Sequence, residues 1–178
     1  MEWNYKISKF QIGKNIHSKV YKIRENISGK EFIVKIYEDS NIINYKNEIN
    51  ILDILNLTQE KTFFIMYKNM QYNPEMFQIP KEIKGFNLEF LFYDYLSKLS
   101  LLDYIKYFVE NKKEIYAKYL CYKLLKAIEI MQSNNINHNK IDTSNIMFDD
   151  NYNPKIIHFS EATIINNKSQ INKDVHEN

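Results

Sequence analysis

Glycine is scarce in this sequence, with three residues among 178, where average usage of about 7% would give roughly a dozen. Glycine lets a backbone approach a phosphate group closely because it has no side chain in the way. A function that depends on a phosphate-binding loop lined by several glycines is therefore disfavoured.

Cysteine and long apolar runs are scarce as well. The single cysteine, Cys121, excludes an internal disulfide and predicts a cytoplasmic or otherwise intracellular, reducing compartment. The longest apolar runs, such as Phe90 to Tyr93, are far shorter than a membrane span, and the first ten residues lack the apolar core of a signal peptide. We therefore expect no membrane partner.

Neither sign of charge dominates. The chain has 24 Lys and Arg against 22 Asp and Glu, a net charge of +2, and the two signs are interspersed. Without a basic stripe, nucleic acid is not an expected partner. Hydrophobic residues make up 44% of the chain and aromatic residues 15%, which predicts one folded domain with a sizeable core.

Short runs rich in Ile, Val, Phe and Tyr dominate the first half and predict antiparallel strands. The first three runs are KISKFQI, KVYKIREN and KEFIVKIY. A helical pattern follows over residues 40–56, and two further runs come after it, KTFFIMYKNM and GFNLEFLFYDYL. Helical spacing of apolar residues returns over residues 100–110 and 113–135. The sequence predicts an α+β fold in two lobes, a five-stranded antiparallel sheet with one helix and then a helical lobe.

Four separate segments carry the polar residues that stand out. They are QIGKNIHSKVYKI (residues 11–23), FIVKIY (32–37), NINHNKIDTSNIMFD (135–149) and NPKIIHFSEA (153–162). In this order and at these spacings they resemble the protein kinase family, over roughly residues 5 to 162. The resemblance implies a protein-kinase-like fold with an N-lobe and hinge at residues 1–96, a C-terminally truncated C-lobe at 97–165 and a polar tail at 166–178.

The resemblance also implies a vestigial nucleotide site. Lys35 matches the lysine that pairs ATP phosphates, and Glu48 matches the helix glutamate that holds this lysine. Asn15 and Ser18 stand where the family has two further glycines of its phosphate loop. The implied site comprises Gly13, Val20, Lys35, Glu48, Tyr95 and Asn145. We expect no obligatory cofactor, with ATP as the ligand that such a site would take.

Two positions depart from the family where its chemistry takes place. Lys140 stands where the resemblance places the catalytic Asp, and an ammonium group has no lone pair to accept a substrate proton. His158 replaces the Asp that coordinates magnesium, an ion that prefers oxygen ligands. We therefore expect no catalytic residue, no bound metal and no enzymatic activity: a pseudokinase, with His158-Phe159-Ser160 in place of the family's Asp-Phe-Gly.

Around Lys140 the family's order of charges is reversed. The family has an acidic residue followed two positions later by a basic one, whereas this chain has Lys140-Ile141-Asp142. We hypothesise that Lys140 and Asp142 form a local ion pair that preserves the shape of the loop.

The long helix has a broad apolar surface. Two adjacent stripes carry apolar side chains: Leu120, Leu124, Ile128 and Met131 on one, and Ala117, Cys121 and Leu125 on the other. Since the resemblance implies that most of the covering C-lobe is missing, part of this surface should be exposed. We expect a protein partner, a larger complex or a second copy of the chain to cover the exposed face of helix 115–131.

The resulting functional prediction is a non-catalytic kinase-like protein that acts as a binding, scaffold or regulatory subunit in a protein assembly. One alternative is a pseudokinase that binds nucleotide. Another is an unconventional phosphotransferase that uses Lys35, Asn145 and either Asp142 or Asp149 in new roles. A further alternative is a kinase decoy of a parasite or virus.

Overall fold

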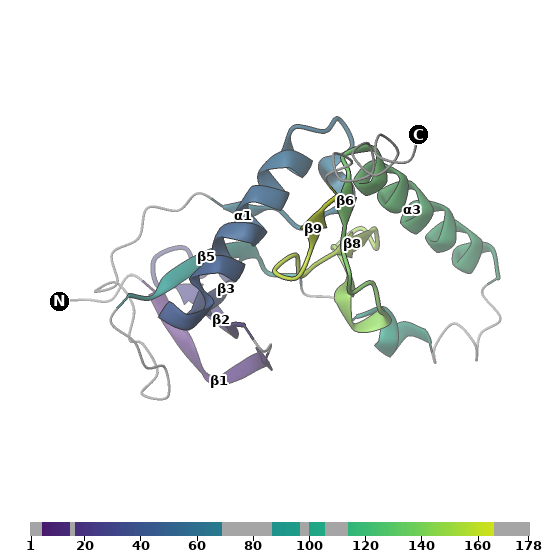
Figure 1. Ribbon diagram of the computed structural model, residues 1–178. Helices are drawn as coiled ribbons and strands as arrows, with labels where there is room; N and C mark the ends of the chain where they lie inside the picture. Colours follow the sequence, from purple (N-terminus) through teal and green to yellow (C-terminus); the bar gives the residue numbers. More distant parts are fainter. Residues whose placement is uncertain (1–4, 15–16, 69–86, 97–99, 106–113, 166–178) are drawn as a thin grey trace, which may run out of the picture.

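A computed structural model describes residues 5–14, 17–68, 87–96, 100–105 and 114–165 of the chain. Figure 1 shows a sheet with helix α1 (Ile42–Asn56) against it, and a second lobe built around helix α3 (Glu114–Ser133). This arrangement confirms the predicted two-lobe α+β fold. No helix within these ranges is long and apolar enough to cross a membrane.

The first lobe contains the predicted five-stranded antiparallel sheet, in the order β1-β2-β3-β5-β4. The strands are β1 (Tyr5–Lys14), β2 (Lys19–Glu25), β3 (Glu31–Tyr37), β4 (Tyr67–Lys68) and β5 (Glu89–Asp94). The turn between β2 and β3 includes Gly29 with a φ of 70°, a left-handed conformation that glycine adopts without strain.

Side chains along β3 and β5 alternate between the two faces of the sheet, as the pleat requires. One face carries an apolar cluster whose buried members are Ile7, Tyr21, Ile23, Phe32, Val34, Ile36, Phe90 and Phe92. The opposite face turns Lys35, Tyr37 and Tyr93 toward α1, where all three contact the same glutamate. The alternation of side chains along β3 and β5 therefore gives the sheet one apolar face and one face that carries these polar groups.

The segment after α1 differs from its predicted conformation. The run KTFFIMYKNM predicts a strand, but Lys61–Phe63 forms a short 3-10 helix, η2, and among the described residues of this run only Tyr67–Lys68 pair as β4. Phe64 is buried, and the N–H of Ile65 donates to the carbonyl of Ile156 at 3.1 Å. The segment packs against the second lobe, a tertiary contact that its apolar composition does not reveal.

The second lobe contains more strand than the sequence predicts. Besides α3 and helical residues 101–105, it has two small antiparallel sheets, which pair β6 (Ile136–Asn137) with β9 (Thr163–Ile164) and β7 (Ile146–Phe148) with β8 (Pro154–Ile156). Strands of two or three residues leave no periodic signal in a sequence. Residues 106–110 of the second predicted helix and the predicted tail lie outside the described residues, and the predicted boundary between residues 96 and 97 stays a prediction.

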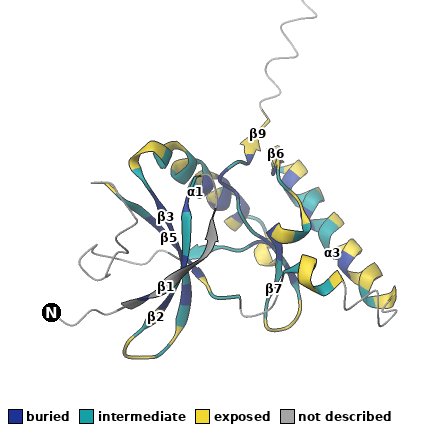
Figure 2. Ribbon diagram, turned by 90° about the horizontal axis from the view of Figure 1, so that it is seen from below, coloured by how far each residue is buried: buried dark blue, intermediate teal, exposed yellow. Residues whose placement is uncertain are grey.

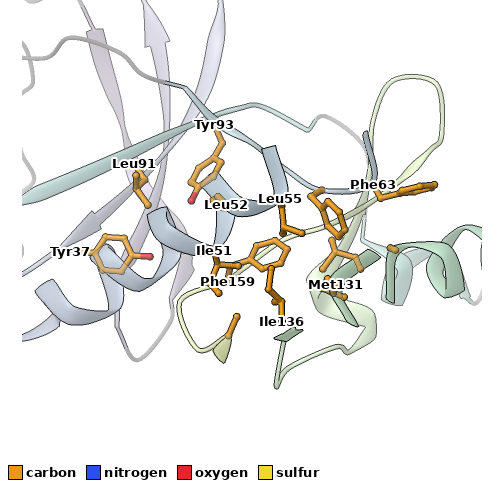
Figure 3. Packing of buried hydrophobic residues seen from close by; sticks show 14 residues of the cluster. Tyr37, Ile51, Leu52, Leu55, Phe63, Leu91, Tyr93, Met131, Ile136 and Phe159 are labelled. Atoms are coloured by element: carbon orange, nitrogen blue, oxygen red, sulfur yellow. The ribbon is translucent and has the colours of Figure 1, made fainter. Parts of the chain in front are cut away.

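One apolar cluster joins the two lobes. It combines side chains of β3, β5, α1, η2 and α3 with Phe159, whose ring is fully buried (Figure 3). Phe159 packs edge-on against Phe64, with 6.0 Å between ring centroids. Figure 2 shows that α3 is buried toward the interior and exposed on its outer side. The residues that precede and follow Phe159 are therefore held at the junction of the lobes.

Candidate functional site

Three of the predicted nucleotide-site residues lie in one row across the sheet. Gly13 on β1 pairs with Val20 on β2, and Val20 pairs with Lys35 on β3. Lys35 in turn pairs with Leu91 on β5. The hairpin spacing in the sequence therefore does bring the predicted glycine, valine and lysine together. Asn15, the other departure in this loop, lies outside the described residues.

Lys35 and Glu48 form a buried ion pair. Lys35 Nζ lies 2.7 Å from Oε1 and 2.6 Å from Oε2 of Glu48, and the two residues are 6% and 1% exposed. Glu48 shares the buried stripe of α1 with Ile51, Leu52 and Leu55, at helical spacing. Packing of this stripe against the cluster therefore turns the carboxylate toward the sheet.

Two tyrosines complete the coordination of this carboxylate. Tyr37 donates its hydroxyl to Oε2 of Glu48, and Tyr93 donates to Oε1 at 2.8 Å. Figure 3 shows both rings between the sheet and α1. Neither tyrosine belongs to the predicted site. Both lie in strand-like runs of the sequence, whose alternation does not indicate a partner on α1.

Electrostatics favour a charged Glu48 with two neutral tyrosines. Burial by itself would raise the pKa of Glu48, but the Lys35 charge and hydrogen bonds from Lys35, Tyr37 and Tyr93 bring it below its usual value. Burial, followed by the Glu48 charge, raises the pKa of both tyrosines. The hydroxyls therefore remain donors, and the carboxylate oxygens are fully occupied.

The loop before β7 is held by Asp142 and Asn145. The Asp142 carboxylate accepts from the backbone N–H groups of Ser144 at 2.8 Å and Asn145 at 3.1 Å, which caps the 3-10 turn η4 (Thr143–Asn145). The Asn145 amide donates to the Lys140 carbonyl and to Asp142, each at 3.1 Å. Asn145 is buried and fixes the loop, in addition to its predicted place in the nucleotide site.

His138 is a structural residue of the same loop. Its Nε2 lies 3.1 Å from the Ile157 carbonyl, and its Nδ1 accepts from the Lys140 N–H at 3.2 Å. The ring packs edge-on against Phe159, with 4.8 Å between centroids. Burial lowers the pKa of His138, so the imidazole is neutral near pH 7. It links the loop to the strand that leads to Phe159.

Lys140 does not form the hypothesised ion pair with Asp142. Its Nζ lies 3.0 Å from Oε1 of Glu161, whereas the Asp142 carboxylate is turned toward the backbone N–H groups of its own turn. Glu161 is a residue that sequence reasoning missed. It stands in the segment NPKIIHFSEA, but its position 21 residues after Lys140 in the sequence conceals the pairing.

His158 lies close to both charged pairs. It has a left-handed backbone with a φ of 79°, and its Nε2 is 3.4 Å from Ser160 Oγ and 3.8 Å from Glu161 Oε1. Burial, together with the Lys35 charge, lowers the pKa of His158 to about 4. The imidazole is therefore neutral near pH 7.

His158 is a poor ligand for magnesium at the position where the family has an Asp. Magnesium requires oxygen ligands in near-octahedral geometry, and His158 offers nitrogen where the family has a carboxylate. No group of three or more His, Cys, Asp or Glu side chains that could hold a metal occurs within the described ranges.

Tyr95 lies apart from the other predicted site residues. The Lys22 ammonium is 4.2 Å from its ring centroid, and its side chain lines a cavity of about 520 Å³. The cavity lies among η2, residues 94–96 and the turn between β7 and β8, and its lining also includes Phe64, Ile65, Asp149 and Lys155. Gly13, Val20, Lys35, Glu48 and Asn145 do not line it.

A family model described as protein kinase domain matches residues 6–177. The chain is 26% identical over 159 residues to the serine/threonine-protein kinase ksg1 of Schizosaccharomyces pombe, which covers 87% of this chain and 24% of that protein. It is 28% identical over 175 residues to calcium-dependent protein kinase 6 of Plasmodium berghei, with 96% of this chain and 11% of that protein covered.

A third similar protein is the liver/testis phosphorylase b kinase gamma catalytic chain of Bos taurus, 26% identical over 141 residues, with 79% of this chain and 33% of that protein covered. The chain thus spans about a third or less of the length of these relatives.

These names correct one expectation. Lys140 and His158 predict a chain that is not an enzyme, whereas the similar proteins are named as kinases, which are enzymes. The prediction that the chain is not an enzyme is therefore wrong by this comparison. With a kinase-domain match over nearly its whole length, the chain belongs to the protein kinase family.

Proposed function

We propose that the chain is a nucleotide-binding domain of the protein kinase family and that its site lies beside Lys35 and Glu48. The observation that carries this proposal is the buried pair itself. A lysine held by a carboxylate in a dry setting is positioned in advance, so a phosphate that binds it loses little conformational entropy. Glu48 and its two tyrosines supply that positioning.

The row of paired residues supports the same location. Val20 is adjacent to Lys35 across β2 and β3 and remains partly exposed, so an apolar ring could pack on it while a phosphate reaches the lysine. Gly13, the next residue in the row, has no side chain that could hinder a ligand approaching β1. In the kinase family, the corresponding glycine and valine lie over the nucleotide.

A thermal-shift titration with ATP, with and without magnesium, tests the proposal. We expect ATP to raise the melting temperature in a concentration-dependent way, and to a similar extent without metal because His158 offers nitrogen where the family has a magnesium-binding carboxylate. Lys35→Ala should abolish the shift. Lys118→Ala, which removes an exposed lysine of α3 that pairs with Glu114, is the control and should retain it.

Phosphoryl transfer is a second candidate function, favoured by the kinase names of the relatives and by Glu161. In such a step the substrate hydroxyl oxygen attacks the γ-phosphorus, the bond to the ADP oxygen breaks, and a carboxylate accepts the hydroxyl proton. Asp142 and Asp149, the carboxylates considered from the sequence, each accept backbone N–H groups of their own turns. Glu161 is the carboxylate that lies against Lys140.

Labelled ATP with magnesium or manganese and a generic protein substrate tests this second candidate. Transfer that disappears in both Lys35→Ala and Glu161→Gln, but persists in Asp149→Asn, would support it. ATP binding without transfer would leave nucleotide binding as the function.

We also propose that α3 binds another protein through its outer side. Leu120 and Met131 of the predicted stripes are buried, but Cys121 and Leu125 are exposed, the latter by 65%. Contiguous exposed apolar side chains on a soluble domain indicate an interaction surface. A scaffold or regulatory role in an assembly would use this side of the helix, and the partner would be a second copy or a different protein.

A further inference from the structure

The hydroxyl of Ser18 is buried without a hydrogen-bond partner among the described residues. Ser18 is 5% exposed. Burying a hydroxyl without a hydrogen bond is unfavourable, so native structures avoid it unless water or a ligand supplies the partner. The structure therefore raises the question of what this hydroxyl binds.

Ser18 lies beside the buried ion pair. The register pairs Val20 with Lys35, so Ser18, two residues earlier in the antiparallel hairpin, comes opposite Tyr37. The pKa of Tyr37 is raised mainly by burial and by Glu48, and the Ser18 hydroxyl acts in the opposite direction, which reflects its closeness. Tyr37 donates its own hydroxyl to Glu48, and Ser18 lies next to the Tyr37 oxygen without forming a hydrogen bond of normal length and angle with it.

Lys35 supplies a second donor at the same place. An ammonium group has three N–H donors, and Glu48 accepts from Lys35 through both of its oxygens. No other acceptor for Lys35 occurs in the described part of the chain. The Lys35 ammonium lies 5.7 Å from the centroid of the Tyr37 ring, and Ser18 also lies beside Tyr37. The remaining N–H of the Lys35 ammonium and the O–H of Ser18 are one cationic and one neutral donor without an acceptor among the described residues. Together they suit an anionic oxygen.

We propose that Ser18 is a ligand-binding residue whose hydroxyl donates a hydrogen bond to a phosphate oxygen of the nucleotide, next to Lys35. The inference rests on the proposed nucleotide site. In the resemblance to kinases, Ser18 occupies a glycine position of the phosphate loop. A donor side chain there would offset part of the phosphate contact that the loop loses with its glycines.

Calorimetric titration of the wild type and of Ser18→Ala with ADP and with adenosine tests the role. We expect Ser18→Ala to bind ADP about tenfold more weakly, since a hydrogen bond to a charged group is lost, and to bind adenosine as the wild type does. Ser18→Gly, which removes the same hydroxyl, should behave alike. Ser28→Ala is the matched control, because Ser28 lies in the exposed turn between β2 and β3, and it should change neither affinity.

Urea unfolding of the free proteins provides the second measurement. An unpartnered hydroxyl contributes no hydrogen bond, so the unfolding midpoint of Ser18→Ala should equal or exceed that of the wild type. A clear fall in the midpoint would show that Ser18 is bonded inside the protein and would overturn the inference. If the wild type binds ADP and Ser18→Ala binds it with the same affinity, the inference is overturned as well. A wild type that binds neither ligand would overturn the proposed nucleotide site as well.

Discussion

The Lys140 ammonium lies 3.0 Å from the Glu161 carboxylate, across the gap between the loop before β7 and the segment after Phe159. Lys140 stands where kinases carry their catalytic Asp, and Glu161 stands three positions after His158, where kinases carry a magnesium ligand. The Glu161 carboxylate also lies 3.8 Å from His158 Nε2. The two positions where the chain lacks the family's carboxylates, Lys140 and His158, therefore both lie close to the Glu161 carboxylate.

A double-mutant cycle on Lys140→Met and Glu161→Gln should give a coupling free energy of about 0.2–1 kcal/mol, because both side chains are about a third exposed and screened by water. The matched cycle of Lys140→Met with Asp142→Asn should give a coupling close to zero. Urea unfolding measures both. A larger coupling for the Asp142 cycle would restore the ion pair that the sequence suggested.

Tyr93→Phe and Tyr37→Phe should each lower the unfolding free energy by about 1.5–3 kcal/mol, since each removes a buried hydrogen bond to the Glu48 carboxylate. Tyr67→Phe is the control, because Tyr67 makes the same type of bond to Asp53 at the surface and should cost less than about 0.5 kcal/mol. Equal losses in all three variants would argue against a special role for the buried carboxylate.

His158 predicts a specific loss of stability in mild acid. Its folded-state pKa of about 4 is below the value near 6.5 of an unfolded chain, so the unfolded state binds the proton more tightly between these values. Stability should be complete above pH 6.5 and fall with decreasing pH, by about 2 kcal/mol between pH 7 and pH 5 from this residue alone.

Urea unfolding midpoints of the wild type and His158→Asn at pH 7 and pH 5 measure the contribution of His158 to this loss of stability. Asn tolerates the left-handed backbone at this position and does not titrate, so the variant should lose less stability on acidification. Some dependence should remain, because burial also lowers the pKa of His138. Identical pH dependence in the two proteins would show that His158 is accessible to protons in the folded state.

Leu125→Glu should reduce self-association or the binding of an apolar fluorescent dye, because Leu125 is 65% exposed on the outer side of α3. Gln132→Glu, which adds the same charge at an exposed polar position of α3, should leave both unchanged. Light scattering and dye titration are the measurements. A monodisperse wild-type monomer that binds no dye would contradict the proposed interaction surface.

The contacts that could be predicted from the sequence are those that follow from local periodicity. Val20 and Lys35 are joined by one hairpin, so strand spacing fixes their pairing. Glu48 follows from helical spacing within α1, which buries it with Leu52 on one stripe. The sheet, its one helix and this half of the site could therefore be predicted from the sequence.

The features that were missed depend on contacts between distant segments. Glu161 approaches Lys140 only because β9 pairs with β6, and strands of two residues have no sequence signature. Lys61–Phe63 forms η2 because Phe64 and its neighbours pack against β8 in the second lobe. Within the described residues the Ser18 hydroxyl lacks a hydrogen-bond partner, a feature of three-dimensional packing that composition cannot indicate.

Amide chemical-shift mapping with ADP tests the nucleotide site most directly. If the account is correct, adding ADP without metal will shift the amide signals of Ser18, Val20 and Lys35, and those of Asn145 and its loop. Signals from the cavity lined by Thr62, Ile65 and Lys155 will stay in place. No shifts at saturating ADP, or shifts confined to that cavity, would contradict nucleotide binding beside Lys35 and Glu48.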